Sequence, residues 1–190
     1  MTPLPPPAFD TLVLQTPRLR LRALQESDAP ALFAIFSDPA VMRYWSTPPW
    51  TTLAQAQDLI ARDIAAMRSG EYLRLGLERT VDATLIGNCT LFNLDLSNQR
   101  AEIGYGLARA AWGQGYMGEA LQALLDFGFG PMRLHRVEAD IDPRNEASAR
   151  SLERLGFQRE GLLRERWMVG DEISDTALYG LLRADWLAQR

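Results

Sequence analysis

Residues 112–118 read W-G-Q-G-Y-M-G, and this glycine-rich stretch decides how the rest of the chain is interpreted. Upstream, apolar side chains alternate with Glu102 and two glycines over residues 101–107, which is the pattern of a half-buried strand. Downstream, apolar residues recur at helical spacing from Gly115. Glycines at a helix start let the backbone approach an anion, and the free N–H groups of the first turn favour phosphate. We therefore expect a pyrophosphate-binding turn, with a tight turn whose glycines only allow close packing as the alternative.

The segments before this loop read as a tail followed by strands and helices. Four of the eleven prolines fall within residues 1–10, so we expect residues 1–15 to form an extended tail ahead of the domain. Next come a strand over 18–24, a short helix from Ser27 to about Pro39, a longer helix capped by Thr51 or Thr52 and closed by Gly70, and strands over 72–79 and 84–92.

The segments after the loop helix complete the predicted fold. They are a strand over 136–141, a helix from Glu146 to Leu155 with Asn145 as its cap and Gly156 at its end, and a closing antiparallel pair over 157–168 and 173–182. Antiparallel runs around one parallel crossover predict an α/β (α+β) fold with a mixed, mostly antiparallel sheet of about seven strands and helices on both faces. We expect residues 16–190 to form a single domain.

Composition argues against several classes of function. A net charge of −4 gives little attraction for a nucleic-acid backbone, so we expect no nucleic-acid partner. Cys89 and His135 are the sole residues of their kinds, which excludes an internal disulfide and makes a metal site unexpected. The sequence begins MTPLPPPAFD, without a signal-peptide pattern, and no run approaches about 20 apolar residues. We therefore expect a cytoplasmic protein with no membrane partner.

The loop also matches the dinucleotide fingerprint literally. Gly113, Gly115 and Gly118 form G-x-G-x-x-G, and Glu138 follows about 20 residues later. In a dinucleotide-binding fold, however, this loop opens the chain and the acidic residue ends the next strand, whereas here more than a hundred residues precede the loop. Glu138 also lies in the middle of its predicted strand. A nicotinamide-dependent oxidoreductase is therefore the lesser alternative.

A second motif lies one strand beyond the loop. Residues 145–157 follow the pattern N-x-x-S-x-x-x-L-x-x-L-G-F, which together with the glycine loop resembles the GNAT acetyltransferase superfamily. In that family the loop reads Gln/Arg-x-x-Gly-x-Gly/Ala and binds the pyrophosphate of coenzyme A. Trp112 and Met117 depart from that pattern on either side of Gly115. Residues 16–19 (T-P-R-L) and 102–105 (E-I-G-Y) are similar to the branch that acetylates N-terminal amines of ribosomal proteins.

The resemblance implies an N-acyltransferase that moves an acetyl group from acetyl-CoA to a primary amine, foremost a protein or peptide N-terminus. It implies that the fourth and fifth predicted strands splay apart, so that backbone groups of Leu107, Ala108 and Arg109 meet the pantetheine arm. It is also compatible with a homodimer. The cofactor-binding residues that it implies are Gly113, Gln114, Gly115, Tyr116, Met117, Gly118, Asn145 and Ser148.

Two steps of the reaction need a proton carrier. Glu102 is the first candidate for the base, because its side chain leaves its strand opposite Ile103 and Tyr105; Asp140 is a weaker one, and a solvated carboxylate is the alternative. Many GNAT relatives protonate the departing thiolate with a tyrosine seven residues after the motif asparagine, where this chain has Leu152. Ser148 is the expected substitute, a role compatible with helix capping.

The acceptor groove is expected between the first two helices, where Tyr44, Trp45 and Trp50 concentrate aromatic surface. Packing over the sheet is the alternative role for these side chains. The acceptor itself stays open, with small-molecule amines competing with peptide N-termini and succinyl-CoA with acetyl-CoA as donor. The absence of a tyrosine at Leu152 keeps a non-catalytic coenzyme A-binding module as a further alternative.

Overall fold

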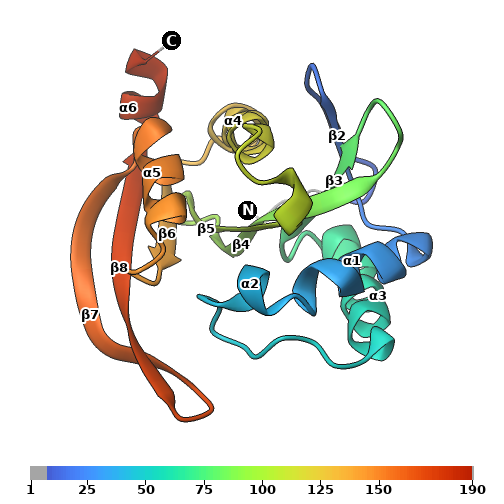
Figure 1. Cartoon of the computed structure of the whole chain (residues 1–190). Helices are drawn as coiled ribbons and strands as arrows, with labels where there is room; N and C mark the ends of the chain where they lie inside the picture. Colours follow the sequence, from blue (N-terminus) through green and yellow to red (C-terminus); the bar gives the residue numbers. More distant parts are fainter. Residues whose placement is uncertain (1–7, 190) are drawn as a thin grey trace.

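The computed structural model describes residues 8–189, which form one sheet in the order β1-β2-β3-β4-β5-β6-β8-β7 with helices against it (Figure 1). Its eight strands are β1 (Val13–Gln15), β2 (Leu19–Arg22), β3 (Leu73–Arg79), β4 (Leu85–Asp95), β5 (Arg100–Leu107), β6 (Arg136–Ile141), β7 (Gln158–Val169) and β8 (Glu172–Leu182). All neighbours are antiparallel except the parallel pair β5–β6. The predicted mixed, mostly antiparallel sheet is confirmed, with one strand more than expected.

The helices begin and end near the residues that the sequence marks. They are α1 (Ala29–Phe36), α2 (Pro39–Met42), α3 (Leu53–Ser69), α4 (Tyr116–Phe129), α5 (Glu146–Arg154) and α6 (Arg183–Ala188). Thr52 caps α3, and its N–H donates to the Gln55 side chain at 3.1 Å. Gly70 ends the same helix in the left-handed conformation at φ 71°. None of the helices in the described range is long and apolar enough to cross a membrane.

The helices cover both faces of the sheet, as predicted (Figure 1). On one face α4 packs over β1, β2 and β4, and its fully buried Leu121 and Leu124 belong to the larger apolar cluster. On the other face α1 contacts β4 and α3 contacts β3, with Leu32 and Ile60 in a second cluster. This arrangement leaves the ends of β5 and β6 between the two helical layers.

The start of the fold differs from the prediction. Residues 13–15 pair with β2 instead of belonging to a tail, and Phe9 is only 2% exposed within the larger cluster. Its ring packs edge-on against Phe127 with centroids 6.4 Å apart. The prediction placed the start of the domain too far along the chain because it followed the proline content. A single buried aromatic residue and a three-residue strand are too short to show a periodic pattern. The rest of the predicted tail, residues 1–7, lies outside the described range.

The strands β5 and β6 separate midway along their length. They pair at Arg100↔Arg136, Ala101↔Val137 and Glu102↔Glu138. Beyond these pairs β5 continues alongside β4 as far as Leu107, and β6 continues alongside β8 as far as Ile141. A gap therefore opens between their C-terminal halves, which is the splay expected from the resemblance.

A buried ion pair ties the turn before α1 to β2. Arg22 donates to Asp28 at 2.7 Å and to Glu78 at 2.6 Å, with its side chain 9% exposed. Removing one partner of a buried pair leaves an uncompensated charge, so Asp28→Ala is expected to cost about 3 kcal/mol of unfolding free energy. Calorimetry should record a midpoint lower by roughly 6–12 °C. Glu26→Ala, in the same turn but exposed, is the matched control and should change little.

Candidate active site

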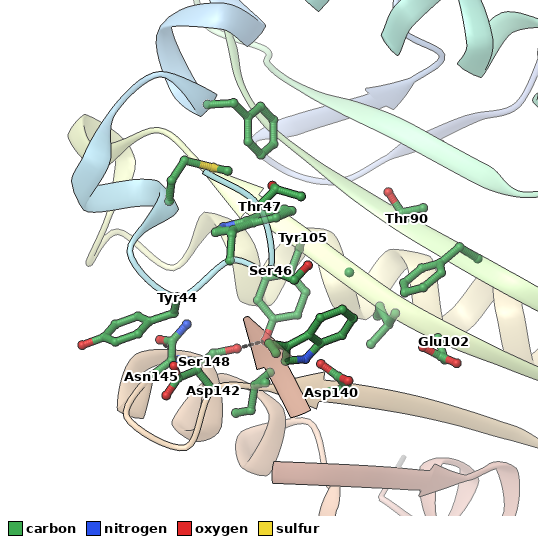
Figure 2. Close-up of a pocket in the computed structure, with 18 of the residues that line it drawn as sticks. Tyr44, Ser46, Thr47, Thr90, Glu102, Tyr105, Asp140, Asp142, Asn145 and Ser148 are labelled. Carbon is green, nitrogen blue, oxygen red and sulfur yellow. Dashed lines mark hydrogen bonds between the residues drawn. The ribbon is translucent and has the colours of Figure 1, made fainter. Parts of the chain in front are cut away.

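A cavity of about 590 Å³ lies where β5 and β6 separate. Its walls come from α3 and the segment between α1 and α3, from β3, β4, β5 and β6, from the start of α5 and from the hairpin β7–β8 (Figure 2). The structure brings together in it the predicted residues Tyr44, Trp45, Trp50, Glu102, Asp140, Asn145 and Ser148. Residues from three distant parts of the sequence thus meet at one site.

Two carboxylates from neighbouring strands face this cavity, Glu102 on β5 and Asp140 on β6 (Figure 2). The Asn93 side-chain amide donates to the Glu102 carboxylate at 3.0 Å and so orients it. Burial raises the pKa of Asp140, the nearby Glu102 charge raises it further, and Arg166 opposes both. The pair can therefore accept a proton or attract an ammonium group.

The cavity wall also carries a pair of hydroxyl groups, those of Tyr105 and Ser148. Their oxygens are 2.6 Å apart (Figure 2). Asn145 caps α5 by accepting the Ser148 N–H at 3.1 Å, which fixes the start of that helix. Burial raises the pKa of Tyr105 to about 12, so its phenol stays protonated at neutral pH. Leu152 is fully buried in the core and supplies no hydroxyl here.

Sequence reasoning missed Tyr105 because strand alternation places it on the face opposite Glu102. Both side chains nevertheless line the cavity. The cavity extends into the gap between β5 and β6, so it is reached from both faces of β5. The signal that could have found Tyr105 is its position past the last β5–β6 pair, where a side chain meets a gap instead of a neighbouring strand.

The aromatic wall combines packing with exposure to the cavity. Trp45 packs edge-on against Phe36 with centroids 5.1 Å apart, and Trp50 lies 4.9 Å from the same ring. A Cβ at Gly106 would lie 3.2 Å from the Trp45 ring, so the glycine lets the indole approach β5. Tyr44 lies below the Arg144 guanidinium, 5.8 Å from ring centroid to carbon. Trp45 and Trp50 thus have the packing role weighed from the sequence and also line the cavity, while their part in holding an acceptor stays a prediction.

The hairpin β7–β8 contributes Arg166 and Trp167 to the cavity wall, and neither residue was predicted from the sequence. The register shifts between Leu163 and Trp167, and Glu165 within this bulge has φ 52°. The Glu165 N–H donates to the Asp175 carboxylate at 2.8 Å, which supports the unusual backbone. A bulge redirects side chains toward a site. Because this one carries no glycine, the sequence gives no signal for it.

The glycine loop leads into α4 as predicted. Gly113 and Gly115 have φ 73° and 79°, a region that favours glycine, and no side chain caps α4. A Cβ at Gly113 or Gly118 would meet nothing within 4 Å. The loop therefore has open space beside these two glycines, which together with the uncapped start of α4 leaves room for a diphosphate.

Two residues before β2, Thr16 and Arg18, bind the first turn of α4 and the glycine loop. The Glu119 carboxylate accepts the Thr16 hydroxyl at 2.6 Å and the Arg18 side chain at 2.6 Å. Arg18 also donates to the Gln114 carbonyl at 2.8 Å and lies over the Tyr116 ring, 4.5 Å from its centroid. The backbone of the loop is thus fixed before any ligand arrives.

The backbone groups expected to be free at the end of β5 are largely paired. The Leu107 carbonyl accepts the Trp112 indole N–H at 2.8 Å. The Ala108 N–H donates to the Ile86 carbonyl at 2.8 Å, and the Arg109 carbonyl accepts the Trp112 N–H at 3.2 Å. Since Ala108 bonds toward β4, strand alternation directs the Leu107 groups toward the gap, where the exposed indole covers the carbonyl.

The structure argues against Glu138 as the acidic residue of a dinucleotide site. Glu138 accepts Arg100 at 3.0 Å and Arg136 at 2.7 Å from the middle of β6. Its carboxylate is therefore already paired with two arginines. It also does not lie at the end of the strand, where an acidic residue that binds a ribose would be. Within residues 8–189 no cluster of histidine, cysteine or acidic side chains could hold a metal ion.

Comparison with known proteins gives a consistent result. Residues 18–158 match the family described as acetyltransferase (GNAT) domain. The chain is 37% identical over 173 residues to the uncharacterized N-acetyltransferase p20 of Bacillus licheniformis, covering 91% of this chain and 97% of that protein.

Two solved structures share the fold at equal sequence distance. The spermidine N-acetyltransferase of Vibrio cholerae, in complex with CoA and spermine, is 22% identical with a TM-score of 0.80, covering 90% of this chain and 99% of that one. The ribosomal-protein-S5-alanine acetyltransferase of Vibrio fischeri is 22% identical with a TM-score of 0.81, covering 92% and 98%. Likeness of fold therefore does not choose between a polyamine and a protein N-terminus.

Proposed function

Since the chain belongs to the GNAT acetyltransferase family and is an N-acetyltransferase that uses acetyl-CoA, we propose that its acceptor is the α-amino group of a protein or peptide N-terminus. The observation that carries this choice is the charge of the cavity, where three arginines offset three carboxylates, Glu102, Asp140 and Asp142, the last of them paired with Arg144. An acceptor with one positive charge suits that balance better than one with several.

The donor would bind along the glycine loop and the gap. Residues 113–118 would hold the diphosphate of acetyl-CoA by their N–H groups, supported by the uncapped start of α4 and the open space at Gly118. The pantetheine arm would lie along the gap beside Leu107, which requires Trp112 to release the carbonyl it now covers. When bound, acetyl-CoA supplies an activated acyl group whose leaving atom is a thiolate.

Glu102 would take the proton of the acceptor. An α-amino group has a pKa of about 8, against about 10.4 for lysine, so its neutral form costs roughly 3.5 kcal/mol less at neutral pH. A carboxylate oriented by Asn93 is a sufficient base for such an amine, directly or through water. Asp140 would stand beside it as a second negative charge that attracts the ammonium form.

The arginines of the cavity argue against a polyamine. Arg62, Arg74 and Arg166 line the cavity, and only Arg74 has an ion-pair partner among the described residues, Asp63 at 3.5 Å. Arg62 and Arg166 are exposed at the cavity wall. A polyamine would bring further positive charges toward them, whereas a peptide N-terminus brings one. The aromatic wall formed by Tyr44, Trp45 and Trp50 could hold the first residues of a peptide.

A coupled thiol-release assay tests this function. With acetyl-CoA, peptides beginning with Ser, Ala or Thr are expected to exceed spermidine in kcat/KM by at least roughly tenfold, because each extra positive charge near an arginine costs about 1 kcal/mol. Added salt should narrow the difference, since exposed charges are screened. Mass spectrometry of the product should place the acetyl group on the α-nitrogen.

The matched control is Arg62→Gln with Arg166→Gln, which keeps a polar side chain at each position and removes two exposed charges. This pair of changes should raise spermidine turnover more than peptide turnover. Faster turnover of spermidine by the unmodified protein would overturn the peptide acceptor in favour of a small amine. Binding of acetyl-CoA without turnover of any amine would favour a non-catalytic module.

A further inference from the structure

The hydroxyl pair of Tyr105 and Ser148 has one hydrogen more than its own hydrogen bond uses. Each hydroxyl carries one hydrogen, and the two oxygens, 2.6 Å apart, share a single hydrogen bond. Among the described residues neither hydroxyl has another hydrogen-bond partner. Whichever oxygen donates, one O–H remains unused, and both residues line the cavity. The wall therefore offers one hydrogen-bond donor that the fold itself does not need.

Chemistry favours Ser148 as the group that presents this hydrogen. A phenol is a stronger donor and a weaker acceptor than an aliphatic hydroxyl, so Tyr105 donates and Ser148 accepts. Ser151, one turn away on α5, donates to the Ala147 carbonyl at 2.8 Å, and a carbonyl four residues earlier is a common acceptor for a serine within a helix. No such bond forms at Ser148, whose oxygen instead faces Tyr105. With Tyr105 as the donor, the Ser148 hydrogen is left for a group in the cavity that Ser148 lines.

Building on the proposed function, we propose that Tyr105 is a positioning residue that orients Ser148, so that Ser148 donates a hydrogen bond to the sulfur that leaves the thioester. Ser148, oriented by the Tyr105 hydroxyl from β5, then takes the place of the tyrosine for which this chain has Leu152 on α5. The arrangement follows from the gap between β5 and β6, which lets a β5 side chain reach the start of α5.

The atoms of the step balance without a further reactant. The acceptor nitrogen forms a bond to the carbonyl carbon and gives its proton to Glu102, while the carbon–sulfur bond breaks and its electron pair stays on sulfur. Ser148 stabilises that negative charge by its hydrogen bond, itself polarised by Tyr105. The thiolate then takes a proton from water, and Glu102 returns its proton to water.

The pKa values decide between a hydrogen bond and full proton transfer. Burial raises the pKa of Tyr105 to about 12, well above the value of about 8.5 for a thiol. Complete transfer from the pair to the thiolate is therefore unfavourable, and the pair acts as a donor that keeps its hydrogen. A hydrogen bond to a charged group corresponds to a rate effect of roughly 10- to 100-fold.

The test compares Tyr105→Phe, Ser148→Ala and the double variant. Each single change is expected to lower kcat roughly 10- to 100-fold with KM for acetyl-CoA unchanged, because the interaction forms only as the thiolate develops. The double variant should be no slower than Ser148→Ala, since Tyr105 acts through Ser148. Multiplicative losses would contradict a shared donor.

A spectroscopic titration provides a readout that a structural role would not change. The thiolate of bound coenzyme A absorbs in the ultraviolet, and a hydrogen bond to it lowers the pKa of the thiol. In the unmodified protein this pKa should lie about one to two pH units below the free value, and both Tyr105→Phe and Ser148→Ala should raise it. Equal values in all three proteins would overturn the proposal.

The matched control is Tyr179→Phe, which removes a buried phenol hydroxyl that donates to Glu153 at 3.3 Å and does not line the cavity. It should change neither kcat nor the thiol pKa. The titration also separates the role of the hydroxyl pair from the proposed function. Failure to bind coenzyme A would overturn the proposed function as well, whereas binding and turnover with an unshifted thiol would overturn only the roles of Tyr105 and Ser148 at the sulfur.

Discussion

Gly118→Glu is expected to weaken coenzyme A binding more than roughly 100-fold while leaving the fold at least as stable as before. A Cβ at Gly118 meets nothing within 4 Å, so the larger side chain fits the ligand-free protein. An acidic residue in the first turn of α4 also favours the helix dipole by up to about 1 kcal/mol. The same charge placed near a diphosphate costs about 4 kcal/mol at 4 Å separation. Stability and affinity should therefore move in opposite directions.

Isothermal titration with coenzyme A and a thermal melt measure the two effects on one protein. Gly118→Gln is the matched control, because it fills the same space without the charge. We expect it to lose affinity far less than Gly118→Glu. Equal losses in both variants would mean that bulk rather than charge is decisive. Unchanged affinity in both would place the diphosphate elsewhere and remove the main support for the donor site.

Glu102→Gln is expected to lower kcat by roughly 10²- to 10⁴-fold, the usual contribution of a general base, with little change in KM for acetyl-CoA. The amide keeps the shape of the side chain and its contact with Asn93, so the cavity should persist. Initial rates with a saturating peptide, followed by thiol release, provide the measurement.

The pH dependence separates Glu102 from Asp140. Burial and then the Glu102 charge raise the pKa of Asp140, so removing that charge should lower it. A base acts when deprotonated, and activity therefore rises with pH through its pKa. If Asp140 were the base, Glu102→Gln would keep its kcat and shift the rising limb to lower pH. A uniform loss across pH, with a smaller effect of Asp140→Asn, is the result expected for Glu102.

Local signals in the sequence were sufficient for the elements that end at special residues. The start of α3 was predicted at Thr51 or Thr52 and its end at Gly70, and the structure has Thr52 as the cap and Gly70 at the end. The loop before α4 follows from a change of apolar period from two to about four residues. Each of these signals acts on the backbone conformation of a few neighbouring residues. Tertiary contacts did not change that conformation, so the predicted helix ends hold in the structure.

The parts of the site that escaped prediction depend on contacts between distant segments. Tyr105 reaches the cavity only because β5 loses its partner after Glu102, and alternation along one strand contains no information about that partner. Arg166 and Trp167 enter through a bulge at Glu165, whose backbone is supported by Asp175 from β8. Phe9 joins the core from a proline-rich stretch too short to show a period.

The contacts of Glu119 with Thr16 and Arg18 make the proposed donor site depend on residues about a hundred positions earlier. Burial alone would raise the pKa of this carboxyl, but hydrogen bonds from Thr16 and Arg18 outweigh it and hold the pKa below its ordinary value. The anion in the first turn of α4 is thereby neutralised by a neighbour, and does not compete for the amides with an incoming diphosphate. Recognition of the diphosphate by residues 113–118 would therefore require Thr16 and Arg18. Removal of the chain up to and including Arg18 should leave the Glu119 carboxylate without these partners, and its negative charge would then repel the donor.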